Sequence, residues 1–289
     1  MGQFSYCTPL KTRDFDLSND EGIDSFRSMI YSFFDEHGRI LPWRTDYTPY
    51  DIFISEVMLQ QTQVERVIPK FTEFKNRFPD FRSLAGASLD QVLAAWQGMG
   101  YNRRAVYLRD AARIIVEKFD GSLPTDPRQL HSLPGIGSAT AASIAAFAFN
   151  APVVFLETNI RTVYIYHFFE SVTEPVPDSA LYPVSELLLD RLNPRKWYSA
   201  LMDYGTVLKK SVGNLSRKST MYQKQTPFKN SNRFLRGAIL RHLLKGDART
   251  AKKLSSFLQT DTNRIQSVLQ TLLDENIVIK RGAAYHIAK

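Results

Sequence analysis

Cysteine is almost absent from this chain of 289 residues, which contains only Cys7. A single cysteine excludes an internal disulfide, a zinc site built from cysteines and an iron–sulfur cluster held by four cysteines. Long apolar runs are also missing, and the first residues do not combine a charged start, an apolar stretch and a cleavage site. We therefore expect a soluble intracellular protein of the cytoplasm or nucleoid, with no membrane contact.

Positive charge is concentrated in one part of the chain. The net charge is +8, and 44% of the residues are hydrophobic, enough for two or three lobes with their own cores. Thirteen Lys and Arg residues but one acid, Asp247, lie between Lys209 and Lys253. That segment predicts contact with a polyanion such as a phosphate backbone. A merely solvated basic surface is the alternative.

Helical periodicity dominates residues 23–212. Apolar residues recur every three to four positions, and short stops such as Phe78-Pro79-Asp80 and Gly98-Met99-Gly100 interrupt the pattern. We expect an all-α domain here, preceded by a polar tail (residues 1–22). Residues 213–232 are rich in Ser, Asn, Gln and Lys and predict a basic polar linker.

The last segment, residues 233–289, has a different pattern. Residues 234–244, 250–258 and 262–275 each predict a helix, and the apolar runs 277–279 and 285–287 flank a turn at Arg281-Gly282. Three helices followed by a short β hairpin is the order of a winged helix. We expect a small winged-helix-like domain that makes a DNA contact, or else serves as a protein-binding or structural appendage.

A glycine turn, Leu133-Pro134-Gly135-Ile136-Gly137, stands between a predicted short helix (127–132) and a helix of small residues (138–149). Two glycines let a backbone approach a phosphate closely, and the exposed N–H groups at the start of the second helix favour an anion. Such a nest binds phosphate backbone without reading bases. A plain interhelical turn is the alternative.

Several motifs resemble, in the same order, those of the MutY-type adenine DNA glycosylases, and more broadly of the endonuclease III superfamily. They are Leu41-Pro42-Trp43-Arg44, Pro49-Tyr50, the block from Ile54 to Val64, Trp96-Gln97-Gly98-Met99-Gly100-Tyr101, the glycine turn, and Asn159-Ile160-Arg161. The resemblance covers about residues 24–212. It implies a two-lobed helix-hairpin-helix glycosylase fold and an enzyme of base excision repair, which flips a base out of double-stranded DNA and cuts its bond to the sugar.

The resemblance assigns roles to individual residues. Cleaving an N-glycosidic bond needs an acid that protonates the departing base, and an anion near the cationic sugar. Glu56 matches the family's catalytic acid, on a predicted helix where Glu56, Gln60 and Gln63 share one face. Gln61 and Tyr101 match the residues that fill the gap left by a flipped base. The full set expected to contact DNA is Arg44, Gln61, Thr62, Tyr101, Pro134, Gly135, Ile136, Gly137, Asn159, Lys209, Lys210, Arg217 and Lys218.

Two departures from the family concern its chemistry. Ala139 stands where bifunctional relatives place a lysine, so no amine is available there for a Schiff base, and lyase activity is not expected. Glu157 stands where the family has an aspartate, and we expect it to stabilise the cationic sugar. The side chain keeps the charge but adds a methylene, and a shift of about 1 Å can cost a catalytic group on the order of 10²-fold in rate.

Two further departures concern cofactor and specificity. Where the family's cluster-binding cysteines would follow Met202-Asp203-Tyr204-Gly205, the chain offers Lys209, Ser216 and Ser219. We expect no iron–sulfur cluster and no other metal, apart from a monovalent ion that hairpin carbonyls could hold. We expect Lys209, Lys210, Arg217 and Lys218 to contact phosphates, with a solvated linker as the alternative. The winged-helix-like domain replaces the family's Nudix-like domain, which recognises 8-oxoguanine.

The leading hypothesis is a monomeric, monofunctional DNA glycosylase that hydrolytically removes adenine opposite guanine or 8-oxoguanine from duplexes carrying a mismatch or lesion. One alternative keeps the mechanism but changes the base to mismatched thymine or uracil, or to cytosine. The other is a non-catalytic protein that binds DNA or senses lesions.

Overall fold

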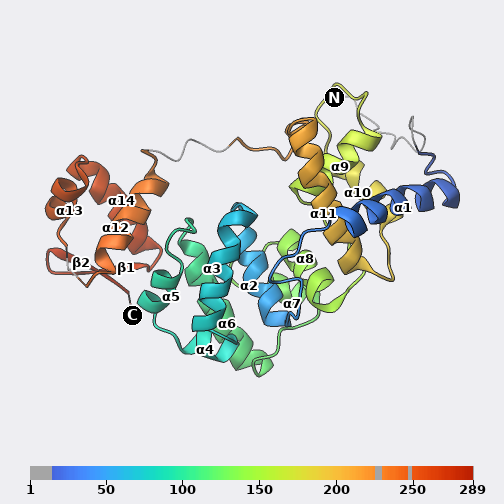
Figure 1. Ribbon diagram of the computed structural model, residues 1–289. Helices are drawn as coiled ribbons and strands as arrows, with labels where there is room; N and C mark the ends of the chain where they lie inside the picture. The colour runs from blue at the N-terminus through green and yellow to red at the C-terminus, as the bar shows by residue number, and fades with distance from the viewer. Residues whose placement is uncertain (1–14, 225–229, 247–248, 289) are drawn as a thin grey trace. The chain divides into compact units, whose positions relative to one another are not determined.

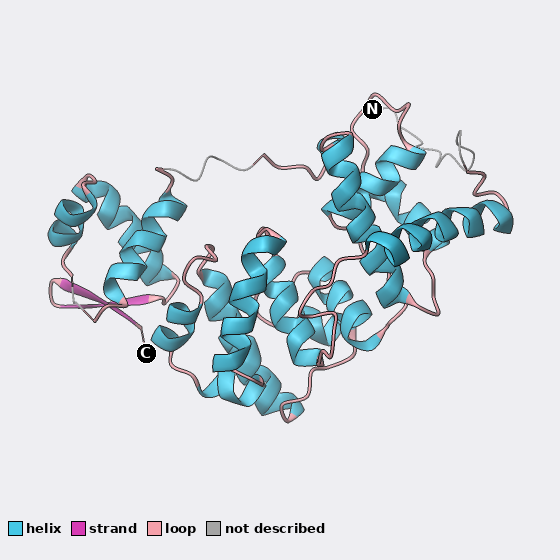
Figure 2. Cartoon of the chain, in the orientation of Figure 1, coloured by secondary structure: helices cyan, strands magenta, loops and turns pink. Residues whose placement is uncertain are grey.

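The structure is a computed structural model that describes residues 15–224, 230–246 and 249–288 (Figure 1). Most of the predicted polar tail, including Cys7, and residues 225–229 of the predicted linker lie outside the described residues. Figure 2 shows helices almost throughout, with two short strands near the C-terminus. The prediction of an all-α fold with a small β hairpin is confirmed. Among the described residues, no helix is long and apolar enough to cross a membrane.

The chain divides into two compact units, each made from two stretches of sequence. Unit 1 comprises residues 1–41 and 137–224, and unit 2 comprises residues 42–136 and 225–289. The domain boundaries proposed from the sequence at 22, 212 and 232 follow the order of the chain and stay a prediction.

Unit 1 is a helical bundle built around α11. Its elements are α1 (Asp20–His37), α8 (Ser138–Phe149), α9 (Thr158–Phe168), α10 (Asp178–Leu188), α11 (Pro194–Ser211) and the 3₁₀ helix η1 (Leu215–Lys218). Fully buried aromatic residues such as Phe26, Trp197 and Tyr198 form its core. A Cβ atom on Gly205 would lie 2.5 Å from the carbonyl oxygen of Asn159, so the close approach of α11 to the start of α9 requires glycine there.

The first part of unit 2 holds six helices. They are α2 (Pro49–Leu59), α3 (Val64–Arg77), α4 (Phe81–Gly86), α5 (Leu89–Ala95), α6 (Arg103–Phe119) and α7 (Pro127–His131). The helix breaks predicted at residues 78–80 and 98–100 are confirmed. A capping box between Thr48 and Asp51 starts α2, and the buried Asp51 carboxylate also pairs with Lys75 of α3 at 2.8 Å. These contacts fix the beginning of α2.

The second part of unit 2 has the predicted winged-helix order. It consists of α12 (Asn232–Leu243), α13 (Ala251–Leu258), α14 (Thr262–Asp274), β1 (Val278–Arg281) and β2 (Ala284–Ile287). The strands pair antiparallel, with Val278 opposite Ile287 and Arg281 opposite Ala284. Leu235, Ile239 and Leu254 are among its buried residues, so this part has a core of its own.

Candidate functional site

Glu56 is a partly exposed acid on a helix that is otherwise almost entirely buried. Eight of the residues of α2 are buried: Tyr50, Asp51, Ile52, Phe53, Ile54, Ser55, Val57 and Met58. Glu56 keeps intermediate exposure among them. A carboxyl group held on a fixed helix at the edge of a packed core has the rigid placement that proton transfer requires.

The helical face predicted for Glu56, Gln60 and Gln63 is wrong. Helix α2 ends at Leu59, Gln60 is its C-cap, and Gln63 is the N-cap of α3. The periodic pattern continues through a turn in which Gln61 adopts a left-handed backbone, which ends the helix. The turn instead separates the acid on the helix from the polar residues that follow it.

The two residues expected to act as wedges share an unusual backbone conformation. The φ angle is +55° at Gln61 and +47° at Tyr101. This region is unfavourable for residues with a Cβ atom, and most other non-glycine residues that adopt it here are Asp or Asn. Backbone strain of this kind clusters at functional sites. Each side chain is thus presented at the tip of a strained turn.

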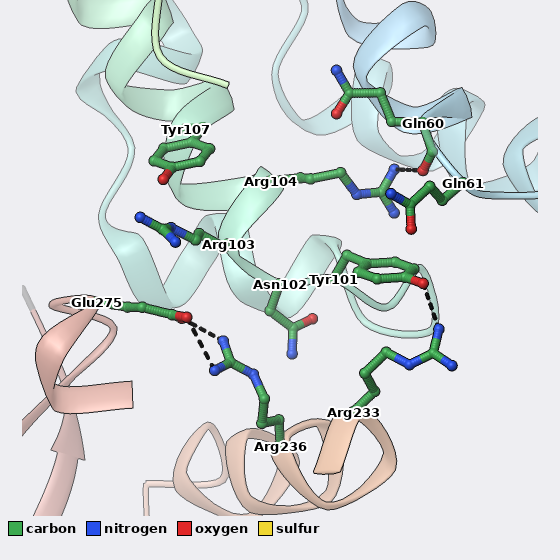
Figure 3. A pocket seen from close by; sticks show the side chains of 10 residues that line it. All are labelled: Gln60, Gln61, Tyr101, Asn102, Arg103, Arg104, Tyr107, Arg233, Arg236 and Glu275. Atoms are coloured by element: carbon green, nitrogen blue, oxygen red, sulfur yellow. Dashed lines mark hydrogen bonds and ion pairs between the residues drawn. The ribbon is translucent and has the colours of Figure 1, made fainter. Parts of the chain in front are cut away.

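Arg104 clamps these two turns together from inside unit 2. Its guanidinium donates to the carbonyl oxygens of Val57 and Met58 at 2.9 Å. A further bond goes to the carbonyl oxygen of Gln60 at 2.6 Å, the bond drawn in Figure 3. It also donates to the Thr62 hydroxyl at 2.9 Å and to the Gly100 carbonyl at 3.4 Å. Arg104 is 8% exposed, and burial lowers its pKa to about 10, partly offset by Tyr101, so it remains a cation at neutral pH.

Sequence reasoning did not identify Arg104 as a site residue. Its neighbour Arg103 is exposed, and nothing in the local sequence distinguishes the two. The carbonyl groups that bind Arg104 come from the end of α2, from the turn that follows it and from the turn before α6, and they become neighbours only in the folded chain. Arg104 positions the turns that carry Gln61 and Tyr101.

The glycine turn is tied to the end of α2 within unit 2. The Gln60 side-chain amide donates to the carbonyl of Gly135 at 3.2 Å, and a ring nitrogen of His131 lies 3.0 Å from the carbonyl of Ile136. Gly135 has φ +76°, and a Cβ atom there would lie 2.8 Å from Tyr107, so conformation and space both require glycine.

Gly137 is the N-cap of α8, and no side chain caps this helix start. Gly137 and Ala139 are exposed at this helix start. The first amides of a helix that lacks a side-chain cap favour an anion. The helices predicted on either side of the turn are confirmed as α7 and α8.

Glu157 caps the start of α9 in unit 1. Its Oε1 accepts from the backbone N–H groups of Asn159 at 2.8 Å and Ile160 at 2.9 Å, and the Asn159 amide lies 3.4 Å from Oε2. Burial raises the pKa of this carboxyl, while the two N–H groups, Arg161 and Lys209 act in the opposite direction. The residue as a whole keeps intermediate exposure. The cap holds both oxygens in a defined position.

The basic residues after Gly205 lie on a folded segment of unit 1. Lys209 and Lys210 belong to the last turn of α11, and Arg217 and Lys218 belong to η1. The Lys218 ammonium donates to the carbonyl of Glu170 at 3.2 Å, and the backbone N–H of Val176 donates to the carbonyl of Lys218 at 2.7 Å. Part of the stretch predicted as linker is therefore packed against its unit.

The donor set in this segment does not fit an iron–sulfur cluster. Ser216 and Ser219 are 4% exposed, the Ser216 hydroxyl donates to Asn214 at 2.6 Å, and the Ser219 hydroxyl accepts from the backbone N–H of Met221 at 3.2 Å. Neutral serine hydroxyls do not replace thiolates as ligands of iron, and the chain contains one cysteine in all. Hydrogen bonds and backbone pairing hold this segment.

The structure groups the predicted residues by unit. In unit 2, Arg104 brings Gln61, Thr62 and Tyr101 together, while the half-buried Arg44 lies in the turn before α2. In unit 1, Glu157 contacts Asn159 and is influenced by the charge of Lys209.

Solved structures share this fold. A thermostable thymine-DNA glycosylase superposes with a TM-score of 0.56 at 24% identity, over 64% of this chain and 86% of its own. A non-covalent Endonuclease III-DNA complex superposes with a TM-score of 0.52 at 17% identity, over 73% of this chain and 90% of its own. The predicted helix-hairpin-helix glycosylase fold is confirmed.

The sequence comparisons are more specific. Residues 54–179 match the model of the HhH-GPD superfamily of base excision DNA repair proteins. The adenine DNA glycosylase of Buchnera aphidicola subsp. Baizongia pistaciae (strain Bp) is 35% identical over 184 residues, which make up 63% of this chain and 52% of that protein. The corresponding enzyme of Mycolicibacterium smegmatis is 36% identical over 180 residues, 62% of this chain and 61% of its own.

These matches confirm the resemblance to MutY-type adenine DNA glycosylases that the sequence motifs indicate. The chain spans about half the length of the first curated relatives it matches.

Proposed function

We propose that the chain is a monofunctional DNA glycosylase that removes adenine, mispaired with guanine or 8-oxoguanine, from double-stranded DNA. Its matched relatives are named adenine DNA glycosylases, and they align with 63% and 62% of this chain. The observation that carries the proposal is the arrangement in unit 2. A partly exposed acid, Glu56, lies on a buried helix directly before the strained turn of Gln61, and Arg104 ties that turn to the turn of Tyr101.

The proposed reaction uses two carboxyl groups. Tyr101 and Gln61 occupy the gap when the adenine leaves the stack, and Glu56 protonates the base as the bond to the sugar breaks, with the bonding electron pair leaving on the base. The ionised carboxylate of Glu157 stabilises the positive charge that develops on the sugar. A water molecule then adds to the sugar carbon, and its proton passes to the Glu56 carboxylate, which restores the acid.

The proposed product is an abasic site in an unbroken strand. Ala139 occupies an exposed position in the first turn of α8, where bifunctional relatives have a lysine. An alanine cannot form a Schiff base with the sugar, so the enzyme has no covalent route to strand cleavage at this position. Strand breaks then require treatment with alkali.

In the proposed complex, residues of both units contact the phosphate backbone of the DNA. The turn from Pro134 to Gly137 offers amide groups to one phosphate, and the basic side chains of η1 and of the end of α11 contact others. Such contacts hold the duplex in register and leave the choice of base to the pocket that receives it.

The test is single-turnover cleavage of duplexes that contain A:8-oxoG, A:G, T:G, U:G or C:G, with and without alkali. We expect strand breaks in the two adenine duplexes after alkali alone. The Glu56→Gln variant should lose excision by about 10²- to 10⁴-fold, because it removes the proton donor, while still binding the duplex.

Breaks confined to another duplex would replace adenine as the substrate. Breaks without alkali would contradict the monofunctional assignment. DNA binding by the wild-type chain without cleavage of any duplex would indicate the non-catalytic alternative.

A further inference from the structure

A pocket of about 320 Å³ within unit 2 opens at the turn that carries Tyr101 (Figure 3). One side comes from the turn after α2 and from the start of α6, and the other comes from α12 and from the end of α14. The pocket is lined by Gln60, Gln61, Tyr101, Asn102, Arg103, Arg104, Tyr107, Arg233, Arg236 and Glu275. The winged-helix-like part therefore contributes side chains to the same pocket as both expected wedge residues.

Four arginines and one glutamate give this pocket a positive charge. All four arginines contact other residues of the protein. The Arg104 guanidinium donates hydrogen bonds to carbonyl groups at the end of α2 and in the turn that follows it. Arg236 forms a partly buried ion pair with Glu275. The other two, Arg103 and Arg233, contact aromatic rings: Arg103 lies 5.0 Å from the ring centre of Tyr107, and Arg233 lies 5.3 Å from that of Tyr101.

Arg233 makes its contact with the wedge residue itself. Its Nη1 donates to the Tyr101 hydroxyl, and its guanidinium lies over the Tyr101 ring (Figure 3). Both contacts pair a full positive charge with a neutral group. A phosphate oxygen forms a stronger, charge-assisted bond with a guanidinium, which matches its geometry with two parallel donors. If Tyr101 enters a duplex, a DNA backbone is brought to the pocket that Arg233 lines.

We propose that this pocket is a phosphate-binding site, which the winged-helix-like part forms next to the wedge residue Tyr101. Arg233 exchanges the Tyr101 hydroxyl for a backbone phosphate of the strand that Tyr101 opens, and Arg103 flanks the same phosphate. The ligand is a phosphodiester, and α12 thereby acts together with the wedge turn. This inference rests on the proposed function in taking DNA as the ligand and Tyr101 as the residue that enters the duplex.

The test measures DNA binding by the full chain, by fluorescence anisotropy over a range of salt concentrations. Two duplexes are compared: an intact one, and one with a central tetrahydrofuran abasic analogue that leaves a gap for the wedge. For Arg233→Ala we expect the slope of log K against log salt to fall by about 0.9 on the gapped duplex, the value of one phosphate contact, and to stay unchanged on the intact one.

Arg241→Ala is the matched control, because Arg241 is an exposed arginine on the same helix but outside the pocket. It should affect both duplexes alike. An Arg233→Ala slope that is unchanged on the gapped duplex, or that falls equally on both, would overturn the proposal. So would tighter binding, which would show that Arg233 restrains the wedge.

Tyr101→Phe provides a second variant, which keeps the ring but removes the hydroxyl that engages Arg233. We expect it to release the guanidinium, so that the slope on the intact duplex steepens toward that on the gapped one. A shallower slope would contradict the exchange. These readouts need no excision, so a wild-type chain that cleaves none of the duplexes would refute the proposed function and leave this inference standing.

Discussion

The two carboxyl groups of the proposed reaction are held in different ways. Glu56 lies inside α2, where its position follows from a helix buried on nearly every side. Glu157 is the N-cap of α9, where two backbone N–H groups donate to its carboxylate. The resemblance of the sequence motifs implies that Glu56 matches the catalytic acid of the related glycosylases, and that Glu157 stands where they have an aspartate.

The difference shows how a longer side chain can be accommodated at one site and not at the other. At Glu157 the helix terminus, rather than the number of methylene groups, sets where the oxygens lie, because both N–H groups bind the same Oε1. At Glu56 the side chain projects from a fixed backbone, so its length determines where the acid lies.

Removing the charge of Glu157 should have the largest effect on the excision rate among the changes that test this comparison. Glu157→Gln keeps an oxygen that accepts the N–H bonds of α9 but loses the negative charge. We expect excision to slow by on the order of 10²-fold, because charge stabilisation of the transition state is lost while the helix keeps its cap. Single-turnover kinetics measure the rate, and thermal unfolding checks the fold.

Glu157→Asp is the matched control, since it keeps the charge and shortens the side chain. It should retain more activity than Glu157→Gln if the cap sets the position of the oxygens. Equal losses of activity in both variants would show that side-chain length matters as much as charge at Glu157. The proposed difference from Glu56, where length sets the position of the acid, would then be wrong.

Local sequence patterns predicted the parts of the molecule that local forces determine. The breaks at Pro79 and Gly98, the turn at Gly135 and the order of helices and strands after residue 232 all follow from turn chemistry and periodicity. The end of α2 at Leu59 was not predicted, because the helical period of the sequence continues into the turn that follows.

The missed features depend on contacts between distant segments. Arg104 becomes a clamp only because its guanidinium meets carbonyl groups more than forty positions away in the chain. Arg233 meets Tyr101 across 132 positions. No pattern of residue types along the chain encodes these distances, so the pocket that they line could not be predicted.

A substitution of Arg104 should have an intermediate effect, on stability. It tests whether the turns next to the helix of Glu56 are held rigidly. Arg104→Met leaves buried carbonyl groups of the two turns without their donor, so we expect the free energy of unfolding to fall by about 1–3 kcal/mol. Chemical denaturation measures the change. Arg103→Met removes an exposed arginine next to it and should leave stability nearly unchanged.

A loss of similar size in both arginine variants would mean that the clamp contributes nothing beyond a surface charge. The two turns would then have to be held by their own backbone bonds. A loss confined to Arg104→Met would confirm that one buried cation fixes the turns that follow α2 and precede α6.

The smallest effect concerns the charge that surrounds Glu157. Burial raises the pKa of its carboxyl, and Lys209 lowers it, so Lys209→Met should raise that pKa further. Because the ionised form stabilises the sugar cation, the acidic limb of the rate profile should move to higher pH by a fraction of a unit. Lys210→Met, on the exposed neighbour, should leave the limb in place. If the acidic limb of the rate profile is unchanged in both variants, or moves to lower pH, Glu157 is not the group whose ionisation controls excision.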